Sequence, residues 1–228
     1  MLKAIIFDFD GVLCDSEPLH YQAFLRVACD FGRTFTYPQY VERYIGYDDR
    51  DAFGAMLEEA GRFDEAHNGE HIARLVAQKG DAFEAVVREG VQTFPGTQQF
   101  VERVARQVPV AIASGATRRD IDLILRSLDF AATFAPIITA DQVQRSKPDP
   151  QTYALAAARM AELHPQLHLA PANCLAIEDT PAGIESARAA GLMTLGITTT
   201  GTAAALHRAG RVIPSLGGVT FEQLRKWY

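Results

Sequence analysis

Apolar residues follow two different spacings along this chain of 228 residues. The first apolar run, residues 4–7, is short and uninterrupted, which is typical of a buried strand. From about residue 18 to residue 89 the apolar positions recur every three or four residues, which indicates helices. From residue 94 onward short apolar runs alternate with the helical spacing, so strands and helices are expected to alternate there.

The middle of the chain is predicted to be wholly helical. Helices are expected over residues 18–31, 38–45, 51–60 and 64–89, with Gly80 interrupting the last of them. A block of helices placed between one strand and the later strands is typical of an inserted unit. The predicted organisation is therefore a core of residues 1–15 and 92–228, with residues 16–91 forming an inserted helical cap domain.

The predicted core alternates strand and helix. Strands are expected at residues 108–113, 134–139, 174–177, 193–197 and 211–213, and helices at 98–107, 118–128, 150–163, 181–190 and 221–227. Parallel strands joined by helices make an α/β fold, a Rossmann-like doubly wound sheet with helices on both faces. Such sheets bind ligands beyond the carboxyl ends of their strands, so polar residues at those ends are the candidates for chemistry.

Composition narrows the classes of function. Hydrophobic residues make up 48% of the chain, which is ample for a core, and the formal net charge is −6. The isoelectric point near 5.5 disfavours binding to nucleic acid or to a membrane surface, because both favour a basic face. The cysteines, Cys14, Cys29 and Cys174, are odd in number and widely spaced, which indicates neither a disulfide framework nor a zinc site. With no signal peptide and no apolar run of about 20 residues, we predict a cytoplasmic protein.

Two aspartates follow the first predicted strand. Asp8 and Asp10 are two residues apart, so along an extended chain their side chains point to the same side. Two carboxylates that share a side repel each other unless a cation or a proton lies between them. Gly11 can take the positive φ that turns the chain away at this point. Taken alone, the pair is also compatible with a solvated loop after an ordinary strand.

Polar residues also stand at later positions where strands are expected to end. Ser114 and the backbone amide of Gly115 precede a helix and can receive a phosphate, and Lys147 offers a compact positive charge for a phosphoryl oxygen. Glu178 and Asp179 add two acids, and carboxylate oxygens are the ligands that Mg²⁺ prefers. Each residue alone has a simpler interpretation as a helix cap or a solvated charge. Their occurrence together predicts one phosphate site that depends on Mg²⁺.

These segments resemble the motifs of a known superfamily. The stretches DFDGVLCDSE, IASGATR, SKPDP and IEDTPAGIESARAAG are similar, in this order, to the four motifs of the haloacid dehalogenase-like hydrolases. The resemblance is to the branch that contains beta-phosphoglucomutase and phosphoglycolate phosphatase. It covers nearly the whole chain, including the helical insertion, which resembles the cap domain of that branch.

The resemblance implies roles for the residues of the core. Asp8 would be the nucleophile that forms a phospho-aspartate, and Asp10 would be the general acid and base. Ser114 and Lys147 would clamp the phosphate. A carboxylate can attack phosphorus only if its repulsion from the phosphate is cancelled, which suits a site with Mg²⁺ and Lys147.

The resemblance also implies the metal ligands. Mg²⁺ would be held by Asp8, Asp179 and the backbone carbonyl of Asp10. Glu178 would be an outer or additional acidic partner. The presence of Asp10 argues against a dehalogenase, whose chemistry needs no acid for the leaving group.

The cap is expected to select the substrate by closing over the site. The resemblance points to His20, a few residues past the first motif, and to Lys79. It also points to Arg50, in a segment that resembles Gly-x-x-Arg but has one extra residue. Arg118, in the first turn after Ser114, could meet an anionic substrate or project into water. For each of these residues the alternative is a solvated surface charge.

Three functions remain open from the sequence. The first is a Mg²⁺-dependent phosphatase that hydrolyses a small phosphorylated metabolite through phospho-Asp8. The second is a mutase similar to beta-phosphoglucomutase, which passes the phosphoryl group to a second hydroxyl of a sugar. The third, a phospho-acceptor module without catalysis, conflicts with Asp10 and the large cap. The expected partner is a small phosphorylated substrate, with neither nucleic acid nor a membrane, and the chain is expected to be a monomer or a weak homo-oligomer.

Overall fold

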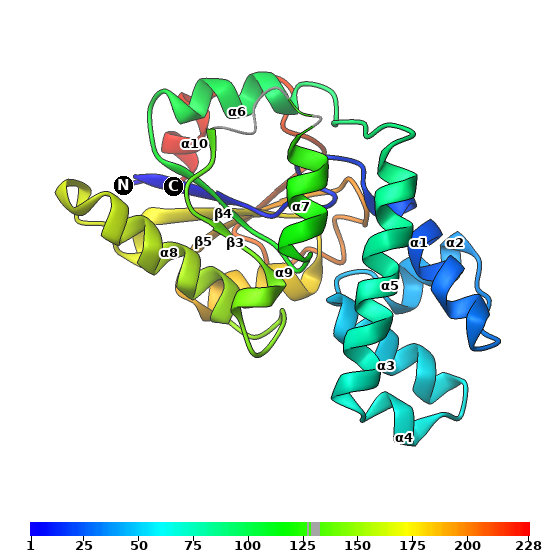
Figure 1. The fold of residues 1–228 in the computed structure, drawn as a ribbon. Coiled ribbons are helices and arrows are strands. Elements are labelled where there is room, and N and C mark those ends of the chain that lie inside the picture. Colours follow the sequence, from blue (N-terminus) through cyan, green and yellow to red (C-terminus); the bar gives the residue numbers. More distant parts are fainter. Residues whose placement is uncertain (127, 129–132) are drawn as a thin grey trace.

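A computed structural model describes residues 1–126, 128 and 133–228. Its centre is a sheet of six strands in the order β3-β2-β1-β4-β5-β6, and all neighbouring strands are parallel (Figure 1). The strands are β1 (Ala4–Phe7), β2 (Val110–Ala113), β3 (Ile137–Ile138), β4 (Cys174–Glu178), β5 (Met193–Ile197) and β6 (Arg211–Ile213). The chain begins near the middle of the sheet and winds outward in both directions, which confirms the predicted doubly wound, Rossmann-like α/β fold.

Helices cover both faces of the sheet because the strands are apolar on both faces. In β1, Ile5 and Phe7 belong to one hydrophobic cluster, and Ala4 and Ile6 belong to the other. Figure 1 shows one layer of helices above the sheet and another below it. The first layer contains α6 (Thr97–Ala105), α7 (Arg118–Leu125) and α10 (Phe221–Trp227), and the second contains α8 (Gln151–Leu163) and α9 (Pro181–Ala189).

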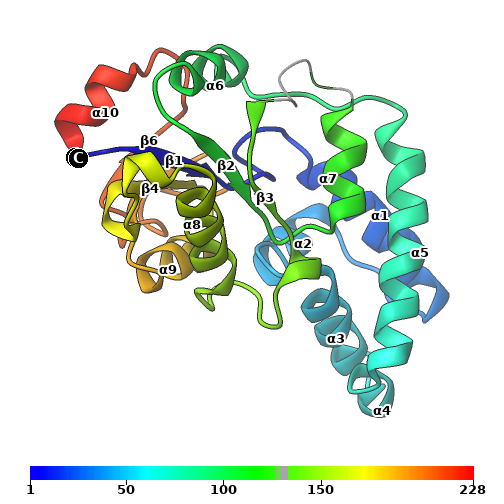
Figure 2. The same ribbon diagram turned by 60° about the vertical axis from the view of Figure 1, so that its left-hand side comes forward.

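A group of helices between β1 and β2 lies beside the sheet, at the carboxyl ends of its strands, and Figure 2 shows it from a second side. These helices pack on one another around a third hydrophobic cluster that includes Phe24, Tyr44, Phe53 and Leu75. They are α1 (Glu17–Asp30), α2 (Tyr37–Arg43), α3 (Asp49–Glu59), α4 (Phe63–Ala66) and α5 (Gly69–Val87). Among the described residues, no helix combines the length and the apolar character that a membrane span requires.

The two chain segments that connect this helical group to the sheet run side by side. The backbone N–H of Asp15 donates to the carbonyl oxygen of Gln92 at 2.8 Å, and Cys14 and Thr93 form an antiparallel bridge. We propose that the domain boundary lies here, with residues 16–91 as the cap and residues 1–15 and 92–228 as the core.

The structure corrects some predicted boundaries. The helix expected over residues 64–89 is not interrupted at Gly80; the break lies before α5, where the Asn68 side chain accepts hydrogen bonds from the backbone of Glu70 and His71. Gly80 lies within α5, where an added Cβ would lie 3.1 Å from Nη1 of the flexible Arg119 side chain of α7. The helix predicted to reach residue 128 ends at residue 125, with residue 127 outside the described part, and the strand predicted at 134–139 covers 137–138.

Replacement of Gly183 by alanine is expected to destabilise the fold. A Cβ at this position of α9 would lie 1.8 Å from Glu178 Oε1, which is held by Lys147 and Tyr153. We expect Gly183→Ala to lower the free energy of unfolding by about 2–4 kcal/mol in a urea titration.

The matched control is Gly54→Ala, because Gly54 lies in α3 and its added Cβ would meet open space. Alanine is the better helix former by about 0.5–1 kcal/mol, so this variant is expected to be slightly stabilised. Equal stabilities of the two variants would show that Glu178 can move away from the new methyl group.

Candidate active site

Asp8, Lys147 and Glu178 form a buried ion-pair cluster at the carboxyl ends of β1 and β4. Lys147 Nζ lies 2.8 Å from Asp8 Oδ1 and 2.7 Å from Glu178 Oε1. In the parallel register of β1 and β4, Phe7 pairs with Ile177. Asp8 and Glu178 are the next residues of the two segments, so they stand at the same height in the sheet. The lysine reaches both acids from the loop that precedes α8.

Glu178 has both carboxylate oxygens occupied by the protein. Tyr153 donates to Oε1 at 2.9 Å, beside Lys147. Oε2 accepts from the backbone N–H groups of Asp179 and Thr180 and from the Thr180 hydroxyl, at 3.0–3.2 Å. Glu178 is therefore fixed in place, and in this arrangement its direct partner is Lys147.

Asp179 has a carboxylate oxygen that no group of the described residues satisfies. Its Oδ1 is buried without a hydrogen-bond partner, whereas Oδ2 accepts from the Thr200 hydroxyl. Ligand atoms of Asp8, Glu178 and Asp179 all lie within 4.8 Å of one another. Gly11, at φ +76°, leaves room for Asp179, because a Cβ there would lie 2.1 Å from Oδ2.

The electrostatics of this cluster fit a further positive charge. Burial, with the charge of Glu178 next in size, raises the pKa of Asp8 from 3.8 to about 8 although Lys147 opposes this shift. Burial and the neighbouring Glu178 and Asp8 also raise the pKa of Asp179. An oxygen-only donor set with an unpaired buried oxygen suits a hard divalent cation such as Mg²⁺.

Asp10 lies at the opening of this cluster and is held by hydrogen bonds. Its Oδ1 accepts from the Ser16 hydroxyl and from His20 Nε2, the latter at 3.1 Å. Burial alone would raise the pKa of Asp10, but His20, Ser16 and the ammonium of Lys79 together lower it. Asp10 is therefore a carboxylate in the free protein, placed to accept a proton.

Lys79 is fully buried behind His20. Its ammonium group lies 2.8 Å from His20 Nδ1, 2.7 Å from Asp120 Oδ2 and 3.0 Å from Asp49 Oδ2. Because lysine has only donors, His20 Nδ1 is the acceptor, which places the ring proton on Nε2, facing Asp10. Lys79 thus links four elements, α1, α3, α5 and α7, through one charge.

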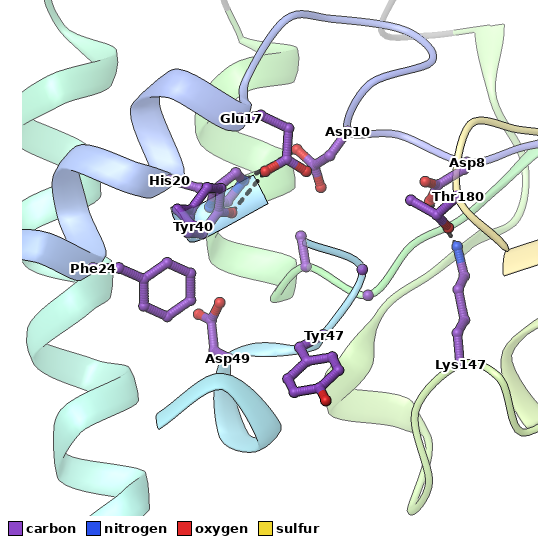
Figure 3. Close-up of a pocket in the computed structure, with 13 residues that line it drawn as sticks. Asp8, Asp10, Glu17, His20, Phe24, Tyr40, Tyr47, Asp49, Lys147 and Thr180 are labelled. Atoms are coloured by element: carbon purple, nitrogen blue, oxygen red, sulfur yellow. Dashed lines mark hydrogen bonds and ion pairs between the residues drawn. The ribbon is translucent and has the colours of Figure 1, made fainter. Parts of the chain in front are cut away.

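A cavity of about 50 Å³ lies between the two aspartates and the cap (Figure 3). Asp8, Lys147 and Thr180 lie on one side of it, and His20, Tyr40 and Phe24 lie on the other. Its remaining lining residues are Asp10, Glu17, Gly46, Tyr47, Asp49, Gly115 and Ala116.

Of the two residues predicted to bind phosphate, Gly115 lines this cavity, whereas Ser114 is not among its lining residues. Ser114 is fully buried, and its Oγ accepts from the backbone N–H of Ala116 at 2.9 Å and lies 3.5 Å from Asp10 Oδ2. Gly115 and Ala116 line the cavity. A phosphoryl group beside Asp8 would therefore meet this turn on one side and Lys147 on another.

Three charged residues that were predicted to contact the substrate do not line the cavity. Lys79 has no exposed surface and does not line the cavity. Arg50 donates to Asp48 Oδ2 at 2.7 Å and 3.1 Å and lies 3.5 Å from the Ala140 carbonyl oxygen. Arg118 is 54% exposed and pairs with Asp122 on the outside of α7.

The side chain of Arg50 is held by Asp48. Asp48 caps α3 by accepting from the backbone N–H of Asp51, and its other oxygen binds Arg50 and the Ser146 hydroxyl. Gly46, Tyr47 and Asp49 line the cavity in place of the arginine.

Sequence reasoning missed Glu17, Tyr40 and Asp49. Glu17 begins α1, and the Tyr40 hydroxyl donates to its Oε2 at 2.6 Å. Burial raises the pKa of Glu17. Burial and the neighbouring charge of Glu17 together raise the pKa of Tyr40 still further. The only signal in the sequence was the acid itself at the end of the first motif; Tyr40 and Asp49 come into the site through cap packing.

The fold and the site together define a class of protein: a Rossmann-like enzyme with paired aspartates, a lysine and an acid cluster at the strand ends. The family model for haloacid dehalogenase-like hydrolases matches residues 5–197. The chain belongs to this family, and it is a hydrolase.

Individual relatives agree with this assignment. The chain is 31% identical over 192 residues to a phosphorylated carbohydrates phosphatase of Thermotoga maritima, a match that covers 84% of this chain and 82% of that protein. It is 26% identical over 228 residues to a beta-phosphoglucomutase of Bacillus subtilis, covering 99% and 95%. The crystal structure of a beta-phosphoglucomutase from Clostridium difficile has the same fold, with a TM-score of 0.86, 24% identity, and coverage of 100% of this chain and 97% of that one.

Loss of Lys79 is expected to reduce stability strongly. In Lys79→Met, Asp49 and Asp120 would remain buried without their cation, which costs about 3–5 kcal/mol. The free energy of unfolding from urea titration measures this loss.

The control for Lys79 is Arg119→Ala, which removes ion pairs between α7 and α5 at the surface. That variant is expected to change stability by about 1 kcal/mol or less. If Lys79→Met were as stable as Arg119→Ala, the buried network would not contribute to the fold.

Without divalent cations, stability is expected to fall as pH rises. A carboxyl group whose folded pKa is above its unfolded value stabilises the fold below the unfolded pKa, and this contribution is lost as pH rises through the folded pKa. For Asp8 the loss extends from pH 3.8 to about 8, and the raised pKa of Asp179 acts in the same direction.

Unfolding free energies measured in a chelator at a series of pH values test this dependence. Asp179→Asn is expected to flatten the curve and to raise stability at pH 8, since it removes a buried charge. A wild-type curve that rises from pH 5 to pH 8 would contradict the proposed charge state of the cluster.

Proposed function

We propose that this hydrolase is a Mg²⁺-dependent phosphatase that hydrolyses a small phosphorylated metabolite through a phospho-aspartate at Asp8. The observation that carries the proposal is the placement of Asp8 between Lys147 and the unpaired carboxylate of Asp179, with Asp10 at the cavity beside it. The Thermotoga maritima relative, named as a phosphatase of phosphorylated carbohydrates, supports the reaction and the substrate class.

The protein groups have distinct roles in this reaction. Asp8 attacks phosphorus, so a bond forms between its carboxylate oxygen and the phosphoryl group while the ester bond to the leaving oxygen breaks. Lys147 and the turn at Ser114 and Gly115 bind the phosphoryl oxygens. Asp10, a carboxylate in the free protein, takes up a proton when the substrate binds and gives it to the leaving oxygen.

Hydrolysis of the phospho-aspartate completes the cycle. Asp10, now a carboxylate held by Ser16 and His20, takes a proton from the attacking water, and the bond between phosphorus and Asp8 breaks. Asp8, Asp179 and the backbone carbonyl of Asp10 would hold Mg²⁺, which supplies positive charge against the phosphoryl oxygens. Glu178 would act outside this set by fixing Lys147.

The mutase is the second candidate, because the Bacillus subtilis relative is a beta-phosphoglucomutase that the chain matches over nearly its full length. Both reactions share the phospho-aspartate and differ in the group that accepts the phosphoryl group. A phospho-acceptor module does not suit Asp10 and a cavity lined by the cap.

Asp8→Asn is expected to abolish turnover, because an amide is a poor nucleophile at phosphorus. Purified protein is incubated with Mg²⁺ and a panel of phosphate esters that includes beta-glucose 1-phosphate, and free phosphate and glucose 6-phosphate are followed. We expect phosphate release by the wild type and a loss of at least about 1000-fold in kcat for Asp8→Asn.

The same assay separates the candidates. Formation of glucose 6-phosphate in excess of free phosphate would favour the mutase. Full activity of Asp8→Asn, or undiminished activity of the wild type in a chelator, would overturn the mechanism. Asp15→Asn is a matched control, because Asp15 is exposed and does not line the cavity.

A further inference from the structure

Acidic side chains outnumber basic ones in the lining of the cavity. Lys147 pairs with Asp8 at 2.8 Å, and Asp10, Gly115 and Ala116 also line the cavity. The cap supplies two carboxyl groups, Glu17 and Asp49. Among the described residues that line the cavity, Lys147 is the one lysine or arginine.

Three positively charged or ionisable groups of the cap, those of Lys79, His20 and Arg50, already bind other residues. Lys79 places its ammonium between Asp49, Asp120 and His20, so one positive charge is shared by two carboxylates. His20 uses both ring nitrogens, for Asp10 and for Lys79. Arg50 is bound to Asp48, outside the cavity.

Glu17 is a polar group of the cap that lines the cavity and can bind a ligand. It is buried, and its Oε2 accepts from the Tyr40 hydroxyl. No other hydrogen bond of the Glu17 side chain occurs in the described part of the chain, so Oε1 can accept a hydrogen bond from a ligand. Whether ionised or protonated, this carboxyl group has an acceptor to offer to a hydroxyl.

We propose that the substrate is a phosphomonoester whose leaving group is small, uncharged and hydroxyl-bearing, and that Glu17 and Asp49 reject a second anionic group. This inference rests on the phosphatase function proposed above. Glu17 accepts a hydrogen bond from a substrate hydroxyl. A carboxylate or a second phosphate placed there would face two carboxyl groups in a cavity that screens charge poorly.

The volume of the cavity agrees with a small leaving group. Space for one water corresponds to about 10–15 Å³ on the same measure, so about 50 Å³ holds only a few groups of that size beyond the protein atoms.

The same charge arrangement bears on the choice between hydrolysis and phosphoryl transfer. Transfer from Asp8 to a sugar phosphate makes a sugar with two phosphates, one of which must face the cap. The cap offers Glu17 and Asp49 at that position and keeps Arg50 outside. Water is therefore the favoured acceptor of the phosphoryl group.

Matched substrate pairs test the proposal. Glycerol 3-phosphate and 3-phosphoglycerate differ only by a CH₂OH group in place of a carboxylate, and glucitol 6-phosphate and 6-phosphogluconate differ in the same way. We expect the wild type with Mg²⁺ to favour the uncharged member of each pair by at least about tenfold in kcat/KM.

Glu17→Gln removes the charge and keeps the acceptor for Tyr40, so the preference is expected to fall to about threefold or less, mainly through a lower KM for the acid. Asp49→Asn is the second variant if Glu17→Gln does not fold. The control is Glu70→Gln, an exposed acid of α5 away from the cavity, which is expected to keep the wild-type preference.

The outcomes separate this inference from the phosphatase function. Release of phosphate from none of these esters or of the wider panel would overturn the phosphatase. Efficient release from both members of each pair, or a preference for the acids, would overturn the charge selection and leave the phosphatase standing. A preference for the uncharged members that persists in both Glu17→Gln and Asp49→Asn would assign the selection to other groups.

Discussion

The rest of this structure depends on the gathering of three buried carboxyl groups beside a single lysine. Asp8, Glu178 and Asp179 lie at the ends of adjacent strands, and Lys147 balances part of their charge. Such an arrangement is costly in a protein without a ligand, because buried carboxylates lose hydration and repel each other. The sheet fixes the spacing of these groups, and a cation together with an anionic phosphoryl group would complete the balance of charge.

The core could be predicted from the sequence because each pattern that marks a strand or a strand end lies within a few consecutive residues. Uninterrupted apolar runs marked the buried strands, and glycines and prolines marked their ends. Once the strands were placed, their parallel order brought Asp8, Ser114 and Asp179 to one edge of the sheet without further assumptions. The interruption at Gly80 was wrong because the helix-breaking tendency of one glycine, about 1 kcal/mol, is outweighed by the packing of buried apolar residues of α5 such as Leu75 and Phe83.

The cap was harder to predict, because the partner of a charged side chain is set by packing between distant segments. Lys79 could be identified as a cation but not as the partner of Asp49 and Asp120, which are 30 and 41 residues away. Arg50 was expected at the substrate, but its guanidinium group binds Asp48. Glu17 and Tyr40 meet only when α1 and α2 pack, so neither carries a recognisable signal alone.

The buried position of Lys79 also affects how far cap and core can be treated as interchangeable modules. Asp120 belongs to α7 of the core and has no exposed surface, while its cation comes from α5 of the cap. Excision of the helical insertion would remove this cation together with α5, which packs against α7, and would leave Asp120 without its partner. A chimera that receives the cap of a relative inherits the same difficulty unless that cap brings its own lysine or Asp120 is replaced together with it.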